Sequence, residues 1–280
     1  MPPPILRTLP DLRALTRGWH RQGETVGVVP TMGALHEGHL SLVEAAKERC
    51  DRVIVTIFVN PKQFNSTDDL AVYPRNEADD AAKLARLSID TLYAPSPDQI
   101  YPEGFATTVS VNGLTAVMEG AHRPGHFDGV ATVCTKLFTQ TAATDAFFGE
   151  KDFQQLQVVR RLARDLDLPV AIHGCPTIRD IDGLALSSRN LLLSGRARTI
   201  APCLYEELEG IVAALTAGQP FDELRRAAIA RLERAGFTGV DYLDLRAADD
   251  LAELDTPARP ARLFAAVQLA GVRLIDNIPA

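Results

Sequence analysis

The sequence predicts an α/β protein, with a parallel sheet in an N-terminal domain at residues 1–176 and a smaller α+β C-terminal domain at residues 177–280. In the first domain, short apolar runs alternate with amphipathic helical patterns, which is typical of strand–helix–strand units. The run at residues 51–60 is almost continuously β-branched and apolar, as in a parallel strand buried on both faces. Beyond residue 190, two alanine-rich helical patterns precede three strand-like runs, and this order favours an α+β domain.

Local patterns predict the elements of the first domain. Leu12, Leu15 and Trp19 form an apolar stripe that indicates a helix over residues 9–23. Strands are predicted at residues 25–29, 51–60, 89–94, 107–111, 144–148 and 169–174. Helices are predicted to end near residue 50 and to start near residues 76, 129 and 153. The segment at 95–102, which is rich in proline, is predicted to be a loop.

The second domain is predicted to begin with a mobile loop at residues 177–190. Two helices are expected at residues 195–217 and 221–235, and strands at residues 240–245, 261–268 and 272–275. The last two strands can form a hairpin across Leu269, Ala270 and Gly271.

Composition excludes several classes of protein. The net charge of −7 and the calculated pI of about 5.4 argue against non-specific binding to nucleic acid or anionic membranes. The sequence has neither an apolar stretch long enough for a transmembrane helix nor a signal peptide core at its start. Cys50, Cys134, Cys175 and Cys203 are too scattered for a zinc site or a disulfide framework, so we expect reduced thiols in a cytoplasmic protein.

The strongest functional signal is VGVVPTMGALHEGHLSLV at residues 26–43. It reads as a strand, a glycine turn and a helix start, which together present backbone N–H groups to a phosphate. Gly33 and Gly38 allow the backbone to approach a ligand closely. His36 and His39 lie three residues apart and can donate to phosphate oxygens, stabilising charge in a transferring group. The alternative is a pair of packed histidines after an ordinary turn, and the combined pattern favours function.

Polar side chains follow the next predicted strand. Asn60 and Gln63 lie in NPKQF, at the end of the 51–60 run. Because ligands bind outside the carboxyl ends of parallel strands, these amides are candidate substrate contacts. The alternative is ordinary turn chemistry, since Asn-Pro often starts a turn.

A second glycine turn, Gly149 to Asp152, follows the strand at 144–148 and repeats the first design. Lys151 can place a positive charge on a phosphate, Asp152 can accept hydrogen bonds from ribose hydroxyls, and Gln155 lies one turn further along the helix. The alternative is a capped, solvated helix start.

Two other segments carry weaker signals. Glu77, Asp79 and Asp80 open a helix, where the helix dipole favours acids; a magnesium ion carried by ATP could use Asp79 or Asp80 through water. Residues 118–132 read as a glycine-rich loop that covers substrate or faces phosphate, since Pro124 between two histidines disfavours a helical metal pair. A helix is expected to start at Gly129, and it would place a second helix N-terminus near the same end of the sheet.

Four motifs together, PTMGALHEGH, FVNPKQF, FFGEKDFQQL and DGLALSSRN, resemble the pantoate–β-alanine ligase family of the nucleotidylyltransferase superfamily with its HxGH motif. The resemblance implies ATP-dependent condensation of (R)-pantoate with β-alanine to give pantothenate, AMP and pyrophosphate through a pantoyl adenylate. It also implies a Rossmann-like first domain, a lid-like second domain and a cytoplasmic homodimer.

The resemblance assigns roles to residues of the matching motifs. It implies that ATP is held by Met32, Gly33, Ala34, Leu35, His36, Glu37, Gly38 and His39, with His39 as the catalytic histidine. It implies that Lys151, Ser188 and Arg189 join His36 around the phosphates, that Gly149 and Asp152, with Glu150 between them, take the ribose, and that Ile178 and Leu186 frame the adenine. From its chemistry alone, the Ser187 hydroxyl can also hydrogen-bond a triphosphate. Gln63 and Gln155, with Asn60 nearby, would bind pantoate.

Departures from the family pattern are small. Lys62 stands where the family commonly has an uncharged residue, so its charge either faces solvent or changes the pantoate pocket.

Two other functions stay open. One is an enzyme that transfers AMP to a phosphate group and needs no amine; the other is a silent nucleotide-binding module that binds ATP without releasing pyrophosphate.

Overall fold

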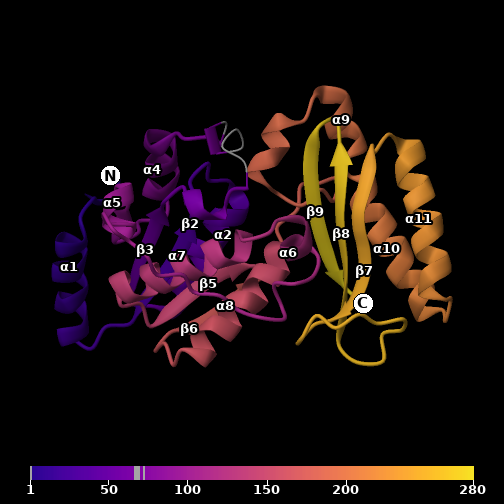
Figure 1. Cartoon of the computed structure of the whole chain (residues 1–280). Coiled ribbons are helices and arrows are strands. Elements are labelled where there is room, and N and C mark those ends of the chain that lie inside the picture. Colours follow the sequence, from indigo (N-terminus) through magenta and orange to yellow (C-terminus); the bar gives the residue numbers. More distant parts are fainter. Residues whose placement is uncertain (1, 66–69, 72) are drawn as a thin grey trace. The chain divides into compact units, whose positions relative to one another are not determined.

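The computed structural model describes residues 2–65, 70–71 and 73–280, so the polar stretch that begins at Ser66 lies largely outside the described residues. The chain forms two compact units (Figure 1). Unit 1 comprises Met1–Glu150 and Gln154–Pro176, and unit 2 comprises Lys151–Phe153 and Thr177–Ala280. Residues 151–153 therefore belong to unit 2, although the residues directly before and after them belong to unit 1. We call these three residues the excursion.

Unit 1 is built on a six-stranded sheet in which every pairing is parallel, in the order β1-β4-β3-β2-β5-β6. The strands are β1 (Ile5–Leu6), β2 (Val26–Thr31), β3 (Arg52–Ile57), β4 (Thr91–Tyr93), β5 (Asp145–Gly149) and β6 (Ala171–Cys175). The helices of eight or more residues are α1 (Leu9–Arg21), α2 (Glu37–Arg49), α4 (Glu77–Ala85), α7 (His126–Thr141) and α8 (Phe153–Asp165).

The strand order creates a switch point between β2 and β5. From β2 the chain winds outward through β3 to β4, and it then returns to place β5 on the other side of β2. In such sheets the ligand crevice opens at the carboxyl ends of the two strands that flank the switch. Residues that follow Thr31 and Gly149 are therefore the ones that this topology presents to a ligand.

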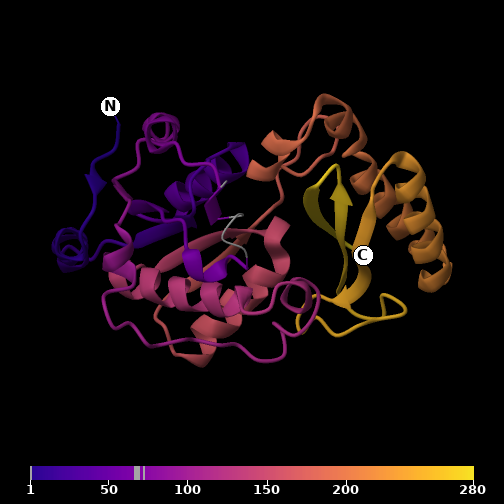
Figure 2. The ribbon, with the colours of Figure 1, turned by 45° about the horizontal axis from the view of Figure 1, so that its top comes forward.

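Burial explains why these runs form strands. Val28, Val29 and Ile54 are fully buried, as expected for strands covered on both faces. Leu40, Val43 and Ala46 of α2 pack into one core with Val29, and α2 lies against β2, β3, β5 and β6 (Figure 2). The predicted α/β fold with a parallel sheet is confirmed.

Several local predictions for unit 1 were wrong. Residues 107–111 form no strand, and the predicted loop at 95–102 contains a short helix, α5 (Pro97–Ile100). A helix, α6 (Glu119–His122), and the first turn of α7 lie within the predicted loop at 118–132, so Gly129 is an interior residue of α7 and not its start. The edge strand β1 was not predicted; it is only two residues long, too short for a periodic signal, and pairs with β4.

Unit 2 has an antiparallel sheet in the order β7-β8-β9, formed by β7 (Gly239–Ala247), β8 (Ala261–Leu269) and β9 (Val272–Pro279). Its helices are α9 (Gly195–Ile200), α10 (Cys203–Thr216) and α11 (Phe221–Ala235). The helix predicted at 195–217 is broken because Pro202 has no N–H to continue it. The predicted hairpin is confirmed, and its turn residues Ala270 and Gly271 have φ of 51° and 80°, as in the mirror-image turns that suit hairpins.

Candidate active site

The turn after β2 is held open by a buried carboxylate. Asp80 of α4 is only 1% exposed, and its two oxygens accept the N–H groups of Ala34 and Leu35 at 2.9 and 2.8 Å. Gly33 has φ of 85°, and a side chain there would begin 3.1 Å from the Asp80 carboxylate. The turn therefore depends on glycine for its conformation and on Asp80 for its hydrogen bonds.

This geometry gives Asp80 a role that the sequence did not indicate. Both of its oxygens serve the turn, so it acts as a structural acceptor, which differs from the water-mediated magnesium contact considered from sequence. Asp79 is exposed on α4 and pairs with Lys83 at 2.9 Å. Among the described residues, no group of three or more His, Cys, Asp or Glu side chains is arranged to hold a metal ion.

The two histidines lie together at the start of α2. His36 is the N-cap of the helix, its N–H group lies 3.4 Å from His39 Nδ1, and the ring centroids are 4.1 Å apart. Accepting this N–H uses the lone pair of Nδ1, so in the neutral ring the proton is on Nε2. His39 is thereby prepared to donate a hydrogen bond from Nε2.

The amides after β3 form a buried cluster. Asn60, which is 1% exposed, donates from Nδ2 to Gln63 Oε1 and to the Gly129 carbonyl, both at 3.0 Å. Gln63 donates from Nε2 to Met32 Sδ at 3.0 Å. The structure thus brings Gln63 together with the turn after β2, whereas Asn60 contacts protein groups and orients Gln63.

Two features of this cluster were missed by sequence reasoning. Gly129 lies so close to the turn after β3 that a Cβ atom would be 2.3 Å from the Lys62 carbonyl oxygen. The main-chain carbonyl of Gln63 lies 2.8 Å from His126 Nδ1 and accepts from Arg123 Nη2 at 3.2 Å. The charged and glycine-rich composition of residues 118–132 was the available signal, but nothing local indicated its partner.

The turn after β5 begins at the other strand of the switch point. Gly149 ends β5, where it pairs with Cys175 of β6, and Glu150 follows it in unit 1. Gln155 is half-buried in the first turn of α8.

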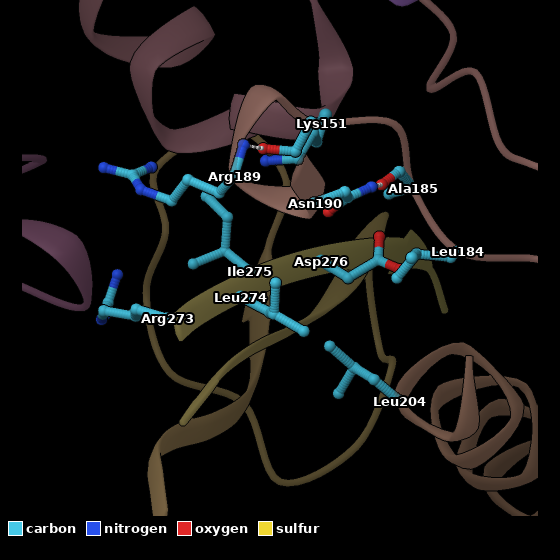
Figure 3. Close-up of a pocket in the computed structure, with 11 residues that line it drawn as sticks. Lys151, Leu184, Ala185, Arg189, Asn190, Leu204, Arg273, Leu274, Ile275 and Asp276 are labelled. Atoms are coloured by element: carbon cyan, nitrogen blue, oxygen red, sulfur yellow. Dashed lines mark hydrogen bonds between the residues drawn. The ribbon is translucent and has the colours of Figure 1, made fainter. Parts of the chain in front are cut away.

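The remaining predicted residues of the glycine turn belong to unit 2. Lys151, Ser187 and Arg189 line a pocket there with Asn190, Arg273 and Asp276, among others (Figure 3). Ser187 Oγ accepts the N–H of Arg189 at 3.3 Å, and Ser188 opens a 3-10 turn, η3 (Ser188–Leu192). Lys151 lies 3.8 Å from Asp152, whose side chain is half exposed. The structure therefore places Lys151 in one pocket with the SSRN segment, residues 187–190, although the two are far apart in sequence.

The predicted mobile loop at 177–190 is braced at its base. Leu186 donates its N–H to the Ile178 carbonyl at 3.0 Å, forming a narrow hairpin. Arg179 pairs with the buried carboxylate of Asp276 at 2.6 Å and stacks 3.8 Å from the Tyr205 ring centroid. The ion pair of Arg179 with Asp276 fixes the base of the hairpin. Ile178 and Leu186, the residues expected to frame adenine, therefore lie on an ordered backbone.

Comparisons with known proteins agree in their descriptions. The model of the family described as pantoate-beta-alanine ligase matches residues 4–279. A pantothenate synthetase from Roseobacter denitrificans is 68% identical over 98% of this chain and 97% of its own length, and one from Ruegeria pomeroyi is 62% identical over 99% and 98%.

Solved structures show the same likeness. A pantothenate synthetase from Thermus thermophilus has a TM-score of 0.91 at 45% identity, covering 98% of each chain. A pantoate-beta-alanine ligase from Francisella tularensis, complexed with β-γ ATP and β-alanine, has a TM-score of 0.85 at 34% identity, covering 99% of this chain and 97% of its own. None of the helices in the described part of this chain is both long and apolar enough to cross a bilayer.

Proposed function

Because the chain belongs to the pantoate–β-alanine ligase family, we propose that it condenses (R)-pantoate with β-alanine, using ATP and releasing AMP and pyrophosphate. The observation that carries the proposal is the convergence of two motifs at the carboxyl ends of β2 and β3. The His36–His39 helix start follows β2, and Gln63, after β3, hydrogen-bonds to Met32 of the same turn. The ATP and β-alanine in the Francisella complex support the same chemistry.

In the first step, the pantoate carboxylate attacks the α-phosphorus of ATP, and pyrophosphate leaves as the pantoyl adenylate forms. Gln63 is oriented so that Nε2 can donate to an oxygen of pantoate, and Gln155 is the second proposed contact. His39 donates from Nε2 to a phosphate oxygen as charge builds up there. A fixed donor of this kind stabilises the transition state because it needs no reorientation during reaction.

Unit 2 carries the cations that the family resemblance assigns to the phosphates of ATP. Lys151, Ser188 and Arg189 would bind phosphate oxygens, Gly149 and Asp152 the ribose, and the Ile178–Leu186 hairpin the adenine. We propose that Mg²⁺ enters as part of Mg–ATP, since Asp80 already serves the turn after β2. Removing Mg²⁺ with a chelator should therefore abolish turnover without changing the thermal unfolding of the free protein; an unfolding shift would indicate a resident metal.

In the second step, the β-alanine amine attacks the acyl carbon of the adenylate, and AMP leaves. No nucleophilic side chain is needed, because adenylation by ATP has already activated the acyl carbon of pantoate, and AMP is the leaving group. A lid-like second domain would protect the adenylate from water until the amine arrives.

The test separates the ligase from both alternatives. Purified protein is given Mg–ATP and D-pantoate, with and without β-alanine, and pyrophosphate and AMP are measured. We expect pyrophosphate release to need pantoate, and sustained AMP release to need β-alanine as well. AMP transfer without an amine would favour the phosphate-acceptor enzyme, and bound ATP with no pyrophosphate would favour the silent module.

We also propose a homodimer in the cytoplasm. The family resemblance supports the dimer, and sedimentation equilibrium at the monomer mass would contradict it. The absence of disulfides among the four cysteines, all of which are described, supports a reducing compartment. Fractionation of cells that express the tagged protein tests the location.

A further inference from the structure

We propose that Tyr101 is a positioning residue for the acid substrate, acting through Asn60 on the amide of Gln63. The proposal rests on the proposed function of Gln63 and extends it to a residue outside the recognised motifs. Tyr101 follows α5, donates from its hydroxyl to Asn60 Oδ1 at 2.7 Å, and is the outer member of a hydrogen-bonded chain that ends at Met32.

The orientation of the Asn60 amide follows from its main-chain partners. Its oxygen accepts the Lys62 N–H at 3.3 Å, and its nitrogen donates to the Gly129 carbonyl at 3.0 Å. An N–H group can only donate and a carbonyl can only accept, so the reverse orientation would place like groups together at both positions. The Asn60 nitrogen therefore faces Gln63.

Gln63 is oriented in turn. Its Oε1 accepts from Asn60, so its Nε2 is the group that faces the turn after β2, where it donates to Met32 Sδ. A thioether sulfur is a weak acceptor, and a carboxylate or hydroxyl oxygen is a stronger one. The site thus presents a donor that an oxygen of the substrate can engage more strongly than the sulfur does.

The bond from Tyr101 is the shortest that Asn60 makes to a side chain, and the surroundings of the phenol maintain it. The phenol is protonated near neutral pH and can donate, and burial raises the pKa of the Tyr101 hydroxyl further. Its ring lies 5.0 Å from that of Phe105 and 6.0 Å from that of Phe58. Removing the hydroxyl leaves Asn60 Oδ1 with only the longer bond from Lys62.

Lys62, the departure from the family pattern, belongs to this arrangement. Its ammonium group lies 5.3 Å from the Tyr101 ring centroid and 5.4 Å from that of Phe105, and the residue is exposed. A cation over an aromatic face is stabilised by the ring quadrupole. The charge therefore lies on the exposed side of the site, over the rings of Tyr101 and Phe105.

The first test is Tyr101→Phe, which removes one oxygen. We expect kcat/KM for pantoate to fall by about 3- to 10-fold, the usual range for one buried hydrogen bond, with KM for ATP changing by less than about 2-fold. Tyr93→Phe is the matched control: it removes a buried phenol bond of 3.0 Å, to Gln140, that has no direct contact with Gln63. An equal effect of both variants would overturn the proposal.

A double-mutant cycle tests the route through Gln63. In a Gln63→Ala background, Tyr101→Phe should have almost no further effect on pantoate, because the group that it positions is gone. A full further loss would overturn the proposal and assign Tyr101 another route.

A crystal structure of Tyr101→Phe tests the geometry independently of activity. We expect the Asn60 and Gln63 amides to shift or become disordered, without a full reversal of Asn60 because its main-chain partners remain, and the Nε2 contact to Met32 to be lost. Unchanged amides would overturn the proposal even if the wild-type protein used a different acid. If the wild-type protein releases no pyrophosphate, the proposed function is refuted. The crystal structure of Tyr101→Phe would then still decide whether Tyr101 positions the Gln63 amide.

Discussion

At the scale of single residues, the site depends on hydrogen bonds that fix which atom of a side chain faces the ligand. His39 accepts at Nδ1 from the main chain, and Gln63 accepts at Oε1 from Asn60. In each case the internal contact determines that the opposite atom is a donor. An anionic substrate finds donors already oriented, which is how a site stabilises developing charge without a reactive side chain.

His39→Ala tests this directly. We expect turnover to fall by about 100-fold or more, the usual cost of removing one transition-state donor, with ATP affinity weakened less. Steady-state kinetics and calorimetric ATP titration measure the two effects. His20→Ala is the control, because His20 is exposed and its ring nitrogen Nε2 lies 2.8 Å from the main-chain carbonyl oxygen of Ala142. Normal turnover by His39→Ala would reject the assigned role.

At the scale of elements, sequence reasoning succeeded where a signal was local and failed where a residue was selected by a distant partner. The strands around the switch point, the helix after HEGH and the hairpin all have local patterns, and each was predicted. Asp80 was interpreted through the helix dipole, although its oxygens hold a turn 45 residues away in the chain. Gly129 was interpreted as a helix start, although a close approach between α7 and the turn after β3 requires it there.

Gly129→Ala separates these two interpretations. Alanine favours a helix interior by about 1 kcal/mol over glycine, so helix propensity alone would stabilise the variant. Its Cβ atom would lie 2.3 Å from the Lys62 carbonyl oxygen and 2.7 Å from the Gln63 nitrogen. Overpacking of this kind costs about 1–3 kcal/mol, so we expect net destabilisation and a higher KM for pantoate.

Gly18→Ala, in α1, is the matched control, because no atom lies within 4 Å of the added Cβ. We expect it to raise the free energy of unfolding by about 0.5–1 kcal/mol, the opposite sign to Gly129→Ala. Urea unfolding measures both variants. Stabilisation of both would show that α7 can withdraw from the turn without loss.

At the scale of the whole molecule, the path of the chain explains why the glycine turn from Gly149 to Asp152 was hard to interpret from sequence. Each unit has its own apolar core, but residues 151–153 leave unit 1 for unit 2 and then return. Local periodicity cannot show such an excursion, because it lasts only three residues. Its consequence is that Lys151 lines a pocket with Ser187 and Arg189 and that its main-chain carbonyl is held by the side chain of Asn277 in β9.

Asn277 is the residue through which unit 2 holds this excursion. It is 3% exposed, donates from Nδ2 to the Lys151 carbonyl at 2.8 Å, and accepts from Arg262 Nε at 2.7 Å. Arg262 in turn stacks 4.2 Å from the Phe153 ring centroid. Asn277→Ala removes both bonds and leaves buried polar groups without them, which costs about 1–3 kcal/mol of stability.

The effect on catalysis should be specific to the nucleotide. If Lys151 binds phosphate, Asn277→Ala should raise KM for ATP by about 5-fold or more, as expected when roughly 1 kcal/mol of positioning is lost, and leave KM for pantoate nearly unchanged. Thr238→Val, at an exposed hydroxyl before β7, is the control. Equal changes in both Michaelis constants would mean that Asn277 supports the fold as a whole. A rise confined to ATP would show that the three-residue excursion places Lys151 for phosphate binding.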